Sequence, residues 1–168
     1  IHTICASKYY SVEEMKQLFQ KGISNFGENR TDILINKYST LKELPITWHF
    51  IGHLQRNKAK DVIPIIDYLH TLDSLKLAEN IQKYRQTPLQ CFIQVNATQE
   101  PQKYGVSLHD VTSFYQAVKK YDKIHIVGLM SMGKLDDLNE TRKAFNTIKT
   151  LSNTLSLPFV SMGMTDDY

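Results

Sequence analysis

Residues 1–22, "IHTICASKYYSVEEMKQLFQKG", contain one complete strand–turn–helix unit. Residues 1–7 are mostly apolar or β-favouring, which is typical of a strand. Ser11 follows as a helix cap, with Glu14 at the capping-box position. Apolar residues then recur at helical spacing as far as Gly22, a residue type that commonly ends helices. This unit predicts a chain in which strands alternate with helices.

The same alternation repeats along the rest of the chain at intervals of roughly 20 to 35 residues. It predicts helices over 73–86, 107–122 and 138–158. It predicts seven strands, over 1–7, 23–27, 47–52, 68–72, 90–96, 124–130 and 159–162. Such repeats build a parallel sheet, and eight of them close a (β/α)8 barrel. We therefore expect an α/β protein with a (β/α)8 TIM barrel, whose residues 1–168 form a single domain truncated at both ends. The eighth strand and an N-terminal helix are expected outside this sequence.

Composition restricts the class of protein. The chain has 168 residues, 42% of them hydrophobic and 22% charged, which fits one globular domain with a core. No apolar run approaches the roughly 20 residues of a membrane helix, and residues 1–20 lack the phases of a signal peptide. Cys5 and Cys91 lie in apolar runs and are expected to be free, buried thiols. We expect a cytoplasmic protein, monomeric and without a membrane partner.

The charge distribution gives little support to nucleic-acid binding. The net charge is only +3, and the one basic cluster is "QRNKAK" at 55–60. This cluster lacks the interleaved aromatic residues of a single-strand binding surface. A solvated helix face explains it most simply, and an RNA- or phosphate-binding strip is the weakest alternative.

Polar residues follow the predicted strands where each one ends. In a parallel barrel these carboxyl ends meet at one rim, where active sites are built. The residues there are Ser7, Lys8, Glu28, Asn29, His53, Gln55, Asp73, Ser74, Asn96, Ser131, Gly163, Thr165 and Asp166. Lys8 is the unusual member. It is either a strand-end lysine that extends to water, or an amine in a partly dry site that forms a Schiff base with an aldehyde such as pyridoxal phosphate.

The stretch "SMGMTDD" at 161–167 offers a place for a phosphate. Gly163 allows close backbone approach, and Ser161 and Thr165 carry hydroxyl groups. Barrels commonly bind phosphate after their seventh and eighth strands. An ordinary turn from strand to helix uses the same residue types.

Six motifs carry a resemblance to a known family. They are "ASK" (6–8), "FGENR" (26–30), "WHFIGHLQRNK" (48–58), "IQVN" (93–96), "GLM" (128–130) and "SMGMT" (161–165). In this order they resemble the YggS/PROSC family of pyridoxal-phosphate-binding homeostasis proteins, whose barrel is similar to the N-terminal domain of alanine racemases. The resemblance implies that Lys8 is the Schiff-base lysine, that Asn29 lines the cofactor and that Met130 packs near its ring.

The same resemblance implies that Ser161 and its neighbours Met162, Gly163 and Thr165 help to hold the phosphate and line the pocket. Some positions differ from the family pattern. Tyr9 and Tyr10 stand where members commonly have a threonine, a second lysine and a proline. Thr165 replaces a usual serine, and the family's Gly-Ser-Thr loop and pyridine-side arginine are not within these 168 residues.

The resemblance implies a protein that holds pyridoxal phosphate as a Schiff base on Lys8 and serves its homeostasis, or its delivery to apo-enzymes, without strong turnover. The alternative is an amino-acid racemase or another enzyme that uses the same linkage. Racemisation needs a proton donor on each face of the cofactor, and alanine racemases take one, a tyrosine, from a second domain. Tyr9, Tyr10 and Tyr104 are available, but the sequence places none of them opposite Lys8.

Two further positions leave alternatives open. His49 shares a strand face with Ile51 and His53, and we expect a hydrogen-bonded core or rim histidine rather than a catalytic base. Trp48 and Phe50 face the other way and are expected between the barrel and its helices. Lys103 lies in the polar loop 99–105 and is either simply exposed, which we favour, or in contact with a second ligand. No metal site is expected.

Overall fold

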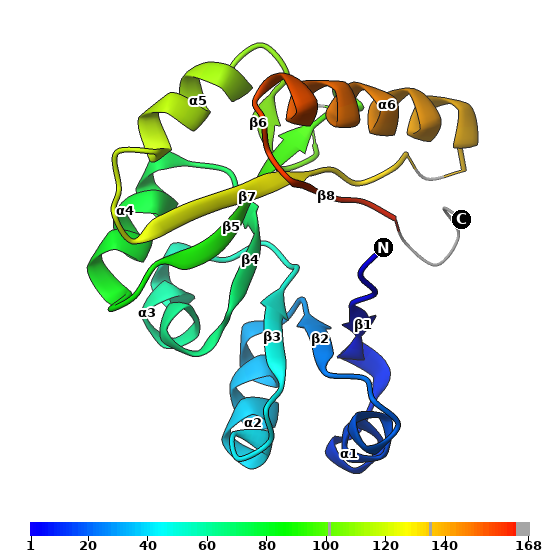
Figure 1. Ribbon diagram of the computed structural model, residues 1–168, viewed down its shortest axis with the longest axis vertical. Coiled ribbons are helices and arrows are strands. Elements are labelled where there is room, and N and C mark those ends of the chain that lie inside the picture. Colours follow the sequence, from blue (N-terminus) through cyan, green and yellow to red (C-terminus); the bar gives the residue numbers. More distant parts are fainter. Residues whose placement is uncertain (101, 135, 164–168) are drawn as a thin grey trace.

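The structure is a computed structural model, which describes residues 1–100, 102–134 and 136–163. Its strands form a curled parallel sheet in the order β1-β2-β3-β4-β5-β7-β8, with β6 paired to β5 (Figure 1). The strands are β1 (Cys5–Ala6), β2 (Asn25–Glu28), β3 (Thr47–Phe50), β4 (Tyr68–Leu72), β5 (Leu89–Asn96), β6 (Val106–Ser107), β7 (Ile124–Met130) and β8 (Phe159–Ser161). This arrangement confirms the expected fold class, a partial (β/α)8 barrel.

The seven predicted strands are all present, with two differences. The first strand is only two residues long instead of covering 1–7, because it pairs with β2 through Cys5 and Ala6 alone and leaves residues 1–3 exposed. The short strand β6 was not predicted. It pairs with the end of β5 through Val106 and Ser107, a match too short to give a periodic signal.

Helices cover the outer face of the sheet (Figure 1). They are α1 (Val12–Gln20), α2 (Thr31–Leu41), α3 (Ala59–Val62), α4 (Leu75–Tyr84), α5 (Val111–Val118) and α6 (Leu138–Thr154), with 3-10 turns η1 (Ser7–Tyr9), η2 (Arg56–Lys58) and η3 (Ile63–Ile65). The predicted capping box of Ser11 and Glu14 is confirmed at the start of α1. The Ser74 side chain caps α4.

Two separate apolar clusters pack against the sheet, one on each of its faces. The larger one lies between sheet and helices and contains Trp48 and Phe50, as the strand alternation predicts. The smaller one consists of Phe92, Val127 and Met130 with Tyr68 against it. Polar side chains surround this second cluster, so the concave side of the sheet is the candidate location of a site.

The strands β1 and β8 form the two edges of the sheet. No hydrogen-bonded pair joins them within the described ranges, but the rings of His2 and Phe159 meet edge to face at 6.0 Å. The cysteines are free, with Cys91 buried and Cys5 half-buried. Of the helices in the described part of the chain, none is long and apolar enough to cross a membrane.

Candidate functional site at the carboxyl ends of the strands

A buried ion pair anchors the turn that carries Lys8. Lys37 Nζ on α2 donates to Glu28 Oε1 on β2 at 2.5 Å and to the Ser7 carbonyl at 2.7 Å. Ser7 Oγ donates to the same Glu28 oxygen at 2.8 Å, and the Ser7 and Glu28 residues are fully buried. These contacts tie η1, which begins at Ser7, to both a strand and a helix.

The anchor lies on the helix side of the sheet. A Cβ on Gly27 would come within 3.1 Å of Ile4 and 3.2 Å of Ile51, so Gly27 faces the concave side. Glu28, the next residue, faces the opposite way toward α2, because neighbours in a strand alternate. The turn with Lys8 is therefore held from outside the barrel, which leaves the concave side free of this ion pair.

Lys8 itself is exposed at the end of β1. Its Nζ lies 4.7 Å from the centroid of the Tyr9 ring, which holds the amine over an aromatic face. Asn29 is also exposed, one residue beyond β2. Its backbone packs so tightly on Gly52 that a Cβ at position 52 would collide with the Asn29 carbonyl. The first three strands thus bring Lys8 and Asn29 to the predicted rim.

Met130 and Ser161 are brought together with a residue that the sequence did not single out. Strand pairing sets Gln94 beside Met130, and Met130 beside Ser161. Phe92 stacks on His70 at 4.5 Å between ring centroids, so Gln94, two residues further along β5, lies on the same concave face. Gln94 was visible only as a letter of the "IQVN" motif, since alternation on a fully buried strand does not reveal which face lines a site.

Unpartnered polar atoms mark this face as suited to a polar ligand. Gln94 Oε1 and Asn96 Oδ1 are buried and have no hydrogen-bond partner among the described residues. A buried polar atom of this kind costs free energy unless a ligand or water completes it. An amide offers both a donor and an acceptor, which suits the ring substituents of pyridoxal phosphate.

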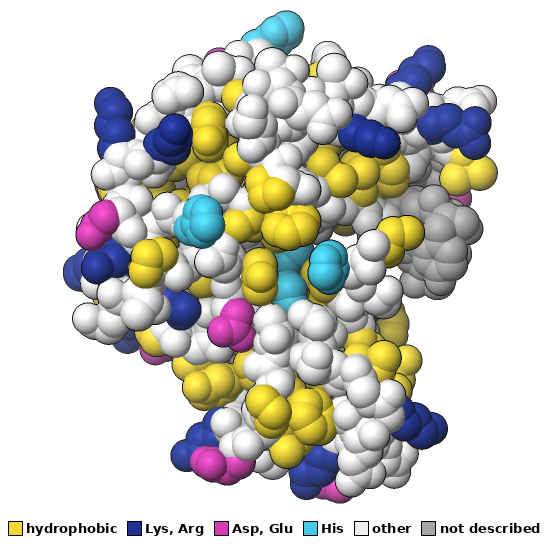
Figure 2. Space-filling model, in the orientation of Figure 1, with side chains coloured by type: hydrophobic (Ala, Val, Ile, Leu, Met, Phe, Trp, Pro, Cys, Tyr) yellow, Lys and Arg dark blue, Asp and Glu magenta, His cyan; other side chains and the backbone are white. Residues whose placement is uncertain are grey.

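A chain of hydrogen bonds crosses the concave side below these residues. Asn25 Oδ1 lies 3.1 Å from His49 Nε2, His49 Nδ1 lies 3.0 Å from His70 Nε2, and His70 Nδ1 lies 2.8 Å from Ser161 Oγ. The prediction that His49 is a hydrogen-bonded core histidine is confirmed. Figure 2 shows histidine side chains in the middle of one face, beside hydrophobic ones.

Burial determines the charge of both rings. It lowers the pKa of His49 from 6.5 to about 4. Burial, with a smaller contribution from His49, lowers the pKa of His70 to about 3. Both imidazoles are therefore neutral near pH 7, and Ser161 faces a neutral acceptor or donor rather than a cation.

The predicted phosphate turn is placed only in part. Gly163 has a φ of +98°, which favours glycine, and a Cβ there would have no contact within 4 Å among the described residues. The backbone conformation at position 163 therefore favours glycine. Met162 packs against the main core instead of the cluster of Met130, because Ser161 occupies the concave side. Thr165 lies outside the described residues.

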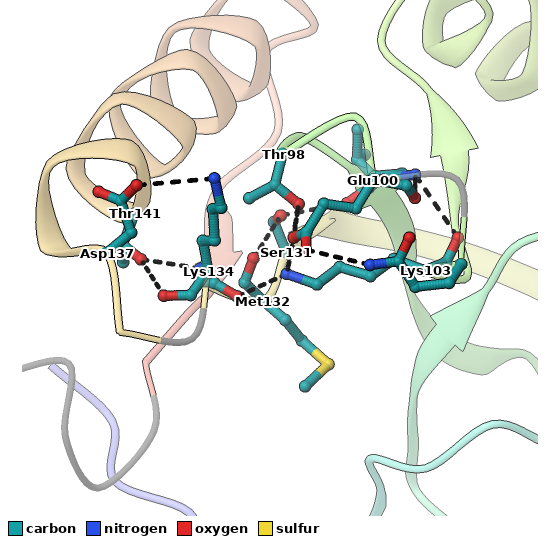
Figure 3. A network of polar contacts seen from close by, with 12 residues as sticks. Thr98, Glu100, Lys103, Ser131, Met132, Lys134, Asp137 and Thr141 are labelled. Atoms are coloured by element: carbon teal, nitrogen blue, oxygen red, sulfur yellow. Dashed lines mark hydrogen bonds and ion pairs between the residues drawn. The ribbon is translucent and has the colours of Figure 1, made fainter.

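Lys103 differs from its prediction as a simply exposed residue, because it is half-buried in a polar network (Figure 3). Its Nζ donates to the Gly133 carbonyl at 2.9 Å and to Thr98 Oγ1 at 3.3 Å, and it pairs with Glu100. The network joins the loops that follow β5 and β7. Its immediate role is to connect these two loops. Tyr104, in the same β5–β6 loop, stacks on His53 at 3.9 Å.

The ion pair under Lys8 can be tested by stability. Lys37→Met leaves the Glu28 carboxylate buried without a counter-charge, and we expect the free energy of unfolding to fall by about 3 to 5 kcal/mol. Lys37→Met with Glu28→Met removes both charges and should cost less. Lys16→Met, which removes an exposed ion pair with Glu13, should change the free energy of unfolding by less than about 1 kcal/mol. Urea unfolding measures all three, and a double variant that is the least stable would contradict this account.

The histidine chain predicts a pH dependence of stability. The unfolded chain binds protons on its histidines below about pH 6.5, whereas folded His49 and His70 do so only near 4 and 3. Stability is therefore complete above pH 6.5 and falls as the pH drops from there toward 4, by about 3 kcal/mol for His49 alone. His49→Gln should flatten this fall, and His125→Gln, at an exposed position, should not. If the free energy of unfolding, measured with urea at each pH, falls equally steeply in both variants, the assignment of this pH dependence to His49 is wrong.

Comparisons of the sequence with known proteins show the family. Residues 7–168 match the family described as alanine racemase, N-terminal domain. A pyridoxal phosphate homeostasis protein of Pasteurella multocida is 33% identical over 180 residues, covering 99% of this chain and 77% of the relative. One from Helicobacter pylori is 34% identical over 175 residues, covering 100% of this chain and 79% of the relative.

Solved structures share the fold. PipY of Synechococcus elongatus with PLP bound has a TM-score of 0.84 and 27% identity, covering 99% of this chain and 83% of that one. Alanine racemase from E. faecalis, at 13% identity, has a TM-score of 0.70 over 90% of this chain and 42% of its own, which shows the fold alone. The chain therefore belongs to the alanine racemase N-terminal domain family and, within it, to the pyridoxal phosphate homeostasis proteins.

Proposed function

We propose that this protein binds pyridoxal phosphate at the carboxyl ends of its strands and acts in the homeostasis or delivery of that cofactor. The observation that carries the proposal is the exposed Lys8, on a turn fixed by Ser7, Glu28 and Lys37, at the rim of a concave face with unpartnered amide atoms. The homeostasis relatives and PipY with its bound PLP support it.

The cofactor supplies an aldehyde, which condenses with a primary amine and releases one water. In this proposal Lys8 provides that amine. Asn29 and Met130 lie beside the ring, and Ser161 with Gly163 contacts the phosphate, to which Thr165 adds a hydroxyl. Met162 contributes through the core that it packs on, since it faces the other side of the sheet from Ser161.

A carrier fits the geometry better than a racemase. Lys8 is exposed beside the exposed ring of Tyr9, so a group bound there remains open to water and to a receiving protein. Turnover needs acid and base groups positioned on both faces of a substrate. Tyr104 is not positioned freely as such an acid or base, because its ring stacks on His53. The proposal extends to apo-enzymes as recipients, to action as a monomer and to the cytoplasm as the location.

The role of Lys8 has a spectroscopic test. The protein with pyridoxal phosphate should absorb near roughly 420 nm, as imines of this cofactor do, and borohydride should fix the adduct. Lys8→Ala should lose both signals, while Lys21→Ala, at another exposed lysine, should keep them. Mass spectrometry after reduction locates the modified residue. A normal yield of adduct in Lys8→Ala would move the site to another lysine.

The carrier role has a kinetic test. We expect transfer of pyridoxal phosphate to an apo-enzyme, with racemase and transaminase turnover below about 10⁻² s⁻¹, against 1 to 10³ s⁻¹ for typical enzymes. The assay follows alanine racemisation and transamination with added cofactor, and Lys8→Ala is the blank. A Lys8-dependent rate above about 1 s⁻¹ would replace the carrier with an enzyme.

A further inference from the structure

The chain of hydrogen bonds from Asn25 to Ser161 connects β2 to β8 through two buried rings. His49 is 5% exposed and His70 is 1% exposed, so water does not interrupt the chain at either ring. The three distances of 3.1, 3.0 and 2.8 Å are all those of good hydrogen bonds. The hydrogen bond made by Asn25 is therefore linked to the hydrogen bond made by Ser161.

Neutral imidazoles give this chain a direction. Each ring has one N–H donor and one acceptor nitrogen, so a ring that accepts at one end must donate at the other. His49 and His70 are both neutral near pH 7, as their burial requires. All three hydrogen bonds must then run the same way, either from Ser161 toward Asn25 or from Asn25 toward Ser161.

The two directions leave Ser161 in different states. When the Asn25 oxygen faces His49, each donor points toward Asn25, and the Ser161 hydroxyl donates its one hydrogen to His70. When the Asn25 amide nitrogen faces His49 instead, His70 donates to Ser161 and the hydroxyl hydrogen is free. A phosphate is an acceptor only, so it can bind the Ser161 hydroxyl in the second state and not in the first.

Turning the Asn25 amide costs little in this fold. Among the described residues, the other hydrogen-bond contact of that amide is a 3.5 Å approach of Nδ2 to Ser24 Oγ, at the outer limit of a hydrogen bond. We propose that Asn25, which does not itself meet the ligand, determines phosphate affinity by setting the direction of the hydrogen bonds through His49 and His70. This inference rests on the proposed function, because it takes Ser161 as a phosphate contact.

The reversal conserves charge and atoms. His70 Nε2 passes its proton to His49 Nδ1, and Ser161 passes its proton to His70 Nδ1. Water supplies a new proton to Ser161 and receives the one that leaves His49 Nε2. Both rings stay neutral throughout, so the anion is met by a hydroxyl donor and not by a new cation.

Asn25→Asp provides the test, because Asp has the shape of Asn but only accepts hydrogen bonds. It fixes the proton on His49 Nε2 and thereby the direction in which Ser161 has no hydrogen to give. At pH 8.5 both rings remain neutral even if the carboxylate raises the pKa of His49 by a few units. We expect the dissociation constant of pyridoxal phosphate to rise about 10- to 100-fold, as for a lost hydrogen bond to a charged group. That of pyridoxal, which lacks the phosphate, should change less than about twofold.

A double-mutant cycle with Ser161→Ala separates this route from simple repulsion by the new charge. In the Ser161→Ala background, Asn25→Asp should weaken pyridoxal phosphate no further. If it weakens binding equally in both backgrounds, the carboxylate acts through space and the inference is wrong. If the protein with its native Asn25 and Ser161 binds no pyridoxal phosphate, the proposed function fails first.

Nitrogen-15 NMR of the histidine rings gives a readout that does not depend on affinity. The ring protons of His49 and His70 should lie on Nε2 without ligand and move to Nδ1 with saturating pyridoxal phosphate. In Asn25→Asp they should stay on Nε2. Identical tautomers with and without the ligand in the native protein would overturn the proposal.

Discussion

The pairing of Glu28 with Lys37 is the constraint on which the geometry of the rim depends. A carboxylate and an ammonium group buried together are stable only if each satisfies the other, and here both also bind Ser7. The pair links β2, α2 and the first turn of the chain in one place. Without it, β1 has only two paired residues to hold Lys8 in position. The position of the exposed Lys8 therefore depends on a second, buried lysine on the helix side of the sheet.

The outer face of the sheet supplies most of the apolar core, and the concave face carries the polar side chains of the candidate site. The outer face packs large apolar side chains such as Phe50 and Leu69 against the helices. The concave face carries three amides, two histidines and a serine around a small cluster of aromatic and apolar groups. Polar groups inside a barrel are costly unless they bind one another, and the Asn25 chain satisfies this condition. The amide oxygens of Gln94 and Asn96 lack such a partner among the described residues, so they are available to a polar ligand.

The sequence predicted the elements well because strand and helix signals are local. The capping box at Ser11 and Glu14, and the outward orientation of Trp48, follow from spacing alone. The polar chain through His70 could not be predicted, because it depends on residues 91 positions apart that meet only through sheet order. The same holds for Lys37, whose partner lies on a different element, and for Lys103, whose loop gives no periodic signal. Motif resemblance pointed to Lys8 and Ser161, but the hydrogen bonds around them needed the fold.

The brevity of β1 has a consequence for how the rim behaves over time. β1 pairs with β2 through two residues, whereas β5 pairs with both β4 and β7, so the resistance of the first turn to local opening depends mainly on the contacts of Ser7 with Glu28 and Lys37. Breaking these contacts would release the turn that carries Lys8 while β4, β5 and β7 stay folded. The position of Lys8 can then change by a local opening rather than by global unfolding, with the rest of the domain acting as a rigid support.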